Sequence, residues 1–133
     1  MIIFMGNKEK GSKAERELYE MFVSNGFRAV RIAGSGMMEN TSGDLIAGKK
    51  GERKYCIEVK SSKTPVKYIT KEQIEELMIF ADIFGLVPVV ALRFNREGWF
   101  FISPKELRDS GKNWVITLEE AKQKGLRFSQ FFC

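Results

Sequence analysis

The 133-residue chain contains no histidine, and this absence removes several classes of enzyme at once. Catalytic triads with a histidine base, nucleases that hold a metal through imidazole, and most zinc sites all need that side chain. A metal in this protein would have to be held by oxygen atoms, which favours hard cations such as Mg²⁺ or Mn²⁺.

Cysteines and long apolar runs are also scarce. The two cysteines are Cys56, in a predicted strand, and Cys133, so their spacing supports neither a disulfide framework nor a zinc site. No apolar run approaches the ~20 residues of a membrane-spanning helix, and the first ten residues lack the basic region of a secretory signal. We therefore expect no membrane contact and an intracellular location.

Composition predicts one compact domain. Hydrophobic residues make up 44% of the chain and charged residues 29%, which is typical of a globular protein. We expect residues 1–133 to form a single domain, with residues 1–10 as a flexible basic arm. The net charge of +5 suits a polyanionic partner, most commonly nucleic acid, although many basic domains bind nothing anionic.

Apolar periodicity predicts an α/β fold. It indicates helices over 11–26 and 70–85, and strands over 27–33, 45–47, 55–60, 87–94 and 99–103. A short helix follows Ser103, and residues 114–125 form a short strand that leads into another helix. Ser12 and Glu15 match a capping box at the start of the first helix. The order predicts an αβββαβ core with a mixed central sheet flanked by helices.

The stretch from Asp44 to Lys60 reads "DLIAGKKGERKYCIEVK", which is typical of a hairpin with a charged, glycine-containing turn. Residues two apart in a strand share a face, so Glu58 and Lys60 point away from the face of Ile57. If the hairpin folds about Gly51, Asp44 lies opposite Glu58. Two carboxylates and an ammonium group then meet at one end of the sheet.

This cluster has a chemical interpretation and an ordinary one. Neighbouring carboxylates raise each other's pKa, and a divalent cation between Asp44 and Glu58 would remove that cost. Such a metal would act as a Lewis acid on a phosphodiester and lower the pKa of a bound water, while Lys60 would contact the water or the phosphate. The same three residues also fit a plain solvent-exposed strand face.

Three other residues have two readings each. Glu15 either reaches over the sheet to assist the metal or serves as the capping partner of Ser12. Arg31 interrupts an apolar strand, where it either binds a phosphate or lies on an exposed face. Ser35 either contacts a phosphate or the metal shell, or is part of a simple Gly-Ser-Gly turn.

Two groups of basic residues are candidates for phosphate contacts. One leads into the first helix and the other forms the hairpin tip; they consist of Lys8, Lys10, Lys13 and Arg16, and of Lys49, Lys50, Arg53 and Lys54. Each group also resembles an ordinary solvated segment.

Taken together, "KGSKAERELYEMFVSNGFRAVRIAGSG", then Asp44, then "IEVKSS" resemble the archaeal Holliday-junction resolvases of the Hjc type, within the PD-(D/E)xK nuclease superfamily. The likeness runs from about Lys10 to Phe101. It implies a restriction-endonuclease-like fold, a homodimer, and resolution of four-way DNA junctions by paired symmetric nicks. It also implies a prokaryotic protein of the cytoplasm that is associated with the nucleoid.

The resemblance assigns roles to the candidate residues. Asp44 and Glu58 would ligate Mg²⁺, with Mn²⁺ as a substitute, and Lys60 would position the attacking water. Glu15 would complete the metal site. Support for phosphate binding and catalysis would come from Arg16, Arg31 and Ser35. We expect the dimer surface to use part of the second helix and the terminal aromatic residues.

One position departs from the superfamily pattern. Glycine stands directly before Asp44, in Ser42-Gly43-Asp44, where the superfamily name has proline, so the backbone before the aspartate is freer. Two other functions remain open: a nuclease of the same superfamily that acts on duplex or flap DNA, and a DNA-binding module without catalysis.

Overall fold

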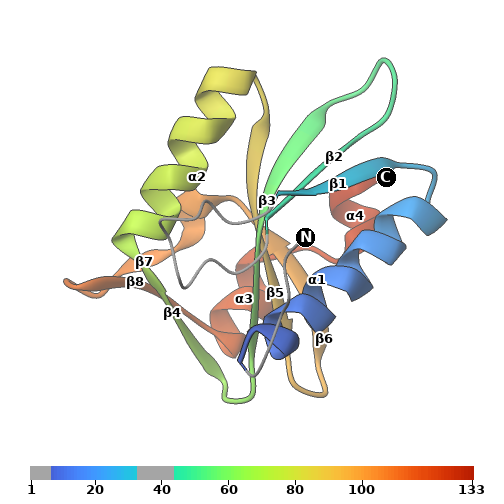
Figure 1. The fold of residues 1–133 in the computed structure, drawn as a ribbon. Coiled ribbons are helices and arrows are strands. Elements are labelled where there is room, and N and C mark those ends of the chain that lie inside the picture. The colour runs from blue at the N-terminus through green and yellow to red at the C-terminus, as the bar shows by residue number, and fades with distance from the viewer. Residues whose placement is uncertain (1–6, 33–43) are drawn as a thin grey trace.

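The structure, a computed structural model, describes residues 7–32 and 44–133, with side chains over 13–32 and 45–133 (Figure 1). The elements, in chain order, are α1 (Asn7–Ser24), β1 (Arg28–Ile32), β2 (Asp44–Gly48), β3 (Lys54–Ser62), β4 (Val66–Thr70), α2 (Lys71–Phe84), β5 (Val87–Phe94), β6 (Gly98–Ile102), the 3₁₀ turn η1 (Pro104–Glu106), β7 (Arg108–Asp109), β8 (Asn113–Thr117), α3 (Leu118–Lys124) and α4 (Phe128–Phe132). In the described part of the chain, no helix is long and apolar enough to cross a membrane.

The first helix is longer than the sequence predicted. It begins at Asn7, so Ser12 lies inside the helix and the predicted capping box with Glu15 is wrong. The helix also includes residues 7–10, which were expected to belong to a flexible arm. The other end agrees with the prediction, since the turn at Asn25 and Gly26 ends the helix.

The predicted mixed sheet is confirmed. Five strands lie in the order β1-β2-β3-β5-β6, and only the β3–β5 pair is parallel, because α2 crosses over between them. The β2–β3 hairpin turns through Gly51, which has a positive φ of 79° that glycine adopts without strain. The αβββαβ order of the core is therefore present, and it carries the hairpin at its centre.

Both faces of this sheet are covered (Figure 1). Helices α1 and α4 pack on one face, against Leu45, Ile57 and Val89, and α2 and α3 pack on the other, against Cys56, Val90 and Leu92. Alternate residues of β3 and β5 thus enter opposite cores, as the period of two in a strand requires.

Helix α2 has the predicted ends but a narrower buried stripe. Thr70 accepts a hydrogen bond from the backbone of Gln73, and Gly85 closes the helix in the left-handed conformation. Ile74, Leu77 and Ala81 are buried. The apolar spacing of this segment also predicts Met78 and Phe84 in the buried stripe, but they are 38% and 63% exposed, so that prediction is wrong.

A second sheet was not predicted. Its three strands lie in the order β4-β8-β7, and it covers the α2 side of the central sheet. We refer to it as the small sheet. The segment that forms β4 buries only Ile69 fully, because the other side of that strand faces solvent, and so its apolar signal is weak.

The terminal aromatic residues belong to the core. Phe132 is 5% exposed, and its ring lies 4.8 Å from that of Phe22 and 5.0 Å from that of Phe101. Phe128 and Phe131 pack against the same cluster. Phe132 is therefore not available to a dimer surface, whereas the expected role of the half-buried Phe128 and Phe131 in such a surface stays a prediction.

Candidate active site

The β2–β3 register places the two predicted acids together. The Cα atom of Asp44 pairs with that of Glu58, and Leu45 pairs with Ile57. Paired residues in antiparallel strands share a face, so the backbone places Asp44 and Glu58 opposite each other on one face, as the sequence predicted. The side chain of Asp44 lies outside the described set.

Glu58 and Lys60 follow Cys56 on the face that α2 covers. Glu58 is 4% exposed, and the Nζ atom of Lys60 lies 3.6 Å from its Oε2 atom. The Lys60 side chain is 10% exposed, so the pair is largely removed from water. This burial excludes the reading of these residues as a solvated strand face.

Glu15 lies on the sheet-facing side of α1, between the buried residues Ala14 and Leu18. It is 3% exposed, and its Oε1 atom accepts from the Arg31 guanidinium, with Nη2 at 2.6 Å and Nε at 2.8 Å. Arg31 thus joins β1 to α1 through the acid. The sequence did not predict this partnership, because Glu15 and Arg31 are 16 residues apart and lie on different elements.

Burial and charge act on Glu15 in opposite directions. Burial raises the pKa of this carboxyl, the Arg31 guanidinium lowers it, and the Glu58 carboxylate raises it further, with a net increase. Glu15 and Glu58 are therefore close enough to influence each other, although they come from a helix and a strand that are far apart in sequence.

These two acids fit a hard metal ion. Of the described side chains, only two that carry charge are buried, and these are Glu15 and Glu58. Their oxygen atoms are the donors that Mg²⁺ and Mn²⁺ prefer, and a cation would offset the burial and the Glu58 repulsion that raise the Glu15 pKa. Within the described side chains, no three acidic or cysteine groups form a metal-binding cluster, so a third ligand would have to come from elsewhere.

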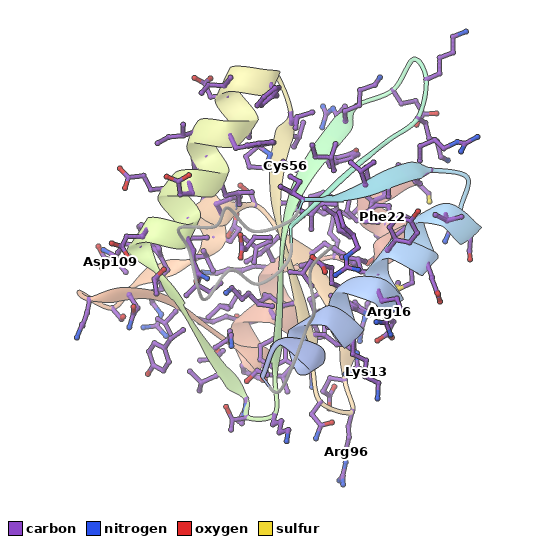
Figure 2. All side chains as sticks on the ribbon, viewed as in Figure 1. Lys13, Arg16, Phe22, Cys56, Arg96 and Asp109 are labelled. Carbon is purple, nitrogen blue, oxygen red and sulfur yellow. The ribbon has the colours of Figure 1, made fainter. Side chains whose placement is uncertain are left out.

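The predicted basic residues lie on two exposed regions. Lys13 and Arg16 project from α1 into solvent (Figure 2), and the backbone of Lys8 and Lys10 continues the same helix. Arg16 and Arg31 line one shallow groove between α1 and β1. The side chains of Lys8 and Lys10 lie outside the described set, as does the whole of Ser35.

The hairpin tip approaches the end of α1. Lys50, Arg53 and Lys54 are exposed, while the Nζ atom of Lys49 lies 4.5 Å from the centre of the Phe27 ring. The hairpin tip thus lies at the C-terminal end of α1, whereas Lys13 and Arg16 lie in the N-terminal and central parts of this helix, so the structure places the two basic groups toward different ends of it.

The Glu15–Arg31 pair provides a stability test in metal-free protein. Replacing Arg31 by Met is expected to lower the free energy of unfolding by about 1–2 kcal/mol at neutral pH, since a buried carboxylate loses its cation and Arg31 is itself partly screened by solvent. Because the pKa of Glu15 is higher in the native state than in the unfolded state, the native state binds more protons at pH values between the two. Stability therefore falls as pH rises through that interval. The loss should therefore shrink in acid.

Urea unfolding in EDTA at about pH 4.5 and pH 8 measures both effects. Arg31→Lys is the matched control, because it keeps the charge and should recover most of the loss. An equal loss at both pH values would mean that Arg31 stabilises the fold by packing instead of by charge.

Comparison with known proteins gives a consistent result. The family model described as archaeal Holliday junction resolvase (Hjc) matches residues 6–132. The chain is 46% identical over 107 residues to the crossover junction endodeoxyribonuclease Hjc of Methanocaldococcus jannaschii, covering 80% of this chain and 75% of that protein. It is 35% identical to the Hjc of Archaeoglobus fulgidus, covering 94% of this chain and 96% of the other.

A solved structure matches as well. The crystal structure of Archaeoglobus fulgidus Hjc, described as a Holliday junction resolvase, superposes with a TM-score of 0.79 at 32% identity. The match covers 90% of this chain and 97% of that one, so the likeness includes the central sheet and the helices on both faces.

Proposed function

Since this chain belongs to the archaeal Holliday junction resolvase (Hjc) family, we propose that it is a structure-selective DNA endonuclease that resolves four-way junctions by paired symmetric nicks. The observation that carries this proposal is the burial of Glu15 and of Glu58, the latter beside Lys60. Burial of acids that are only partly neutralised costs free energy, and a catalytic metal would give these acids a function. The protein would act on chromosomal DNA in the cytoplasm, in the nucleoid of a prokaryotic cell.

The family implies a divalent metal, and we propose Mg²⁺, with Mn²⁺ as a substitute. Asp44, Glu58 and Glu15 would hold it. A bound cation of this kind neutralises charge on the phosphate and lowers the pKa of water. Two separate elements of the fold would position these acids: the β2–β3 hairpin carries Asp44 and Glu58, and α1 carries Glu15.

The protein's own cations would do the remaining work. Lys60, next to Glu58, would orient the attacking water or hold a phosphate oxygen. Arg31 lowers the pKa of Glu15 against the effect of burial and, since its side chain is 37% exposed, would contact a phosphate from the same position. We propose Ser35 as a further phosphate contact.

The two basic groups, toward the two ends of α1, would bind the arms of the junction. Arg16 and Arg31 share one groove, and Lys13 extends it along the helix. The Lys8 and Lys10 side chains and the hairpin tip of Lys49, Lys50, Arg53 and Lys54 would add phosphate contacts. Binding should therefore weaken steeply with salt, as phosphate contacts require.

A homodimer would match the two-fold symmetry of the junction. The outer side of α2 supports this proposal. We call it the α2 face; it consists of Ile79 and Ile83, which are 48% and 71% exposed and point away from the buried stripe, with Met78 (38% exposed) on one flank and Phe84 (63% exposed) on the other. Exposed apolar side chains of this kind form a surface that a second copy covers in a two-fold dimer.

Cleavage of a labelled immobile four-way junction beside a linear duplex of the same sequence tests the function. With Mg²⁺ we expect paired nicks in opposing arms of the junction only, and none in EDTA. Equal cleavage of both substrates would retain the nuclease and reject the junction selectivity. Tight binding without cleavage in Mg²⁺ or Mn²⁺ would leave a DNA-binding module.

A further inference from the structure

Lys67 on β4 lies in an unusual environment for a lysine. It is half-buried, and burial lowers the pKa of its amine. Within the described side chains, residues 13–32 and 45–133, neither a hydrogen bond nor an ion pair engages it, and burial is the one cause of its lowered pKa. A desolvated cation without an anion costs free energy, so its retention needs a reason outside the fold itself.

The strand pairing shows which way Lys67 faces. It pairs with Ile116 on β8 and shares a face with Ile69, two residues along β4. Ile69 and Ile116 both enter the core between the small sheet and the central sheet. Lys67 is therefore on the side of the small sheet that faces the central sheet.

The same core identifies the opposing surface. It includes Cys56 of β3 and Val90 and Leu92 of β5, which lie on one face of the central sheet. Glu58 and Lys60 are on that face, because they follow Cys56 by two and four residues. Lys67 thus projects from the small sheet toward the face that carries the candidate active site.

The β3–β4 turn fixes the distance between these elements. The Ser62 hydroxyl lies within hydrogen-bond distance of the Val66 carbonyl, at 3.0 Å, and of the Thr64 carbonyl, at 2.9 Å, and its one hydrogen is shared between them. Ser62 is two residues beyond Lys60 on the same face, and Val66 immediately precedes Lys67. The backbone at Lys67 is therefore tied to the end of the strand that carries the catalytic lysine.

We propose that Lys67 is a DNA-contacting residue that binds a backbone phosphate adjacent to the one cleaved at Asp44, Glu58 and Lys60. This inference rests on the proposed function. The phosphodiester supplies an anion that none of the described side chains offers to this amine, and the partly dry surroundings strengthen the contact. Lys67 and Lys60 then hold neighbouring phosphates from opposite sheets, which fixes the position of the strand along the site.

Lys67→Met tests this proposal, with Lys105→Met as a control of equal charge at an exposed position. Junction affinity is measured over a range of salt in EDTA, so that no cleavage interferes. We expect Lys67→Met to weaken binding about five- to tenfold and to reduce the slope of log K against log salt by about one. Lys105→Met should change affinity less than about twofold, and Lys67→Arg should restore most of the binding.

Thermal unfolding separates a binding role from a structural one. Lys67→Met removes a desolvated cation and keeps its apolar stem, so its midpoint should equal or exceed that of the wild type. A lower midpoint, or junction affinity equal to that of Lys105→Met, would overturn the proposal. Weaker binding in a protein of equal or greater stability supports it.

The wild-type measurement keeps the two hypotheses distinct. A wild type that prefers the junction, with Lys67→Met equal to its control, rejects the Lys67 contact alone. A wild type that binds junction and duplex equally rejects junction selectivity, and the same comparison of variants then tests Lys67 on the duplex. A wild type that binds neither rejects both.

Discussion

Replacing Glu58 by Gln, or Asp44 by Asn, is expected to reduce junction cleavage at least ~1,000-fold, which corresponds to about 4 kcal/mol of lost transition-state stabilisation. Each change removes a negative oxygen from the proposed metal site and leaves the shape of the side chain. Junction affinity should change less than about threefold, because phosphate contacts to the basic surface supply most of it. Single-turnover cleavage and anisotropy binding of one labelled junction measure the two quantities.

Glu52→Gln is the matched control for Glu58→Gln. It makes the same chemical change in the same hairpin, but in the exposed turn, so cleavage should stay within about twofold of the wild type. Cleavage by Glu58→Gln at more than about a tenth of the wild-type rate would reject the metal assignment. A parallel collapse of affinity would instead indicate a misfolded hairpin, which urea unfolding would reveal.

Replacing Ile83 by Glu is expected to separate the proposed dimer into monomers. Ile83 is 71% exposed in the single chain, so the substitution should alter monomer stability little. In a two-fold interface it would place two carboxylates in apolar surroundings, at a cost of at least ~3 kcal/mol and thus roughly a hundredfold in the dissociation constant. Sedimentation equilibrium measures this change directly.

Coupled cleavage provides the functional readout of the same variant. A cruciform plasmid cut twice in one binding event becomes linear, whereas single cuts yield nicked circles, so Ile83→Glu should shift the products toward nicked circles. Val23→Glu, at a position that is 48% exposed on α1, should leave the products unchanged. Linear product from a demonstrated monomer would show that the α2 face does not couple the two cuts.

The proposed site explains why its acids tolerate burial. Glu15 is neutralised in part by Arg31, and Glu58 lies beside Lys60, so each acid has a cation near it before any metal binds. The net rise in the Glu15 pKa shows that this compensation is incomplete. A site of this kind is stabilised by a divalent ion, and protein saturated with Mg²⁺ should unfold at a higher temperature than protein in EDTA.

Several elements of the fold were readable from the sequence because their signals are local. Thr70 and Gly85 mark the ends of α2 through hydrogen bonds and a backbone conformation that involve only neighbouring residues. The hairpin about Gly51 is equally local, and strand alternation then determines that Asp44 and Glu58 pair. These predictions needed no knowledge of what packs against either element.

The predictions that failed concern surfaces whose partners are distant in sequence. Phe132 could lie on a dimer surface or in the core, and only the docking of α4 against Phe22 and Phe101 decided between them. Phe84 has the spacing of the apolar stripe of α2, but it lies beyond the part of this helix that the small sheet and β5 cover. The small sheet itself depends on pairing β4 with β8, about fifty residues later.

The sequence by itself determined which residues could hold a metal and which face of the hairpin presents them, because turn chemistry and strand periodicity act over a few residues. Only the tertiary structure decided the state of each charge. Glu15 is a buried partner of Arg31 and not a helix cap, and Lys67 is a half-buried amine and not a solvated one. Desolvation depends on every element packed around a group, and no local pattern in the chain records it.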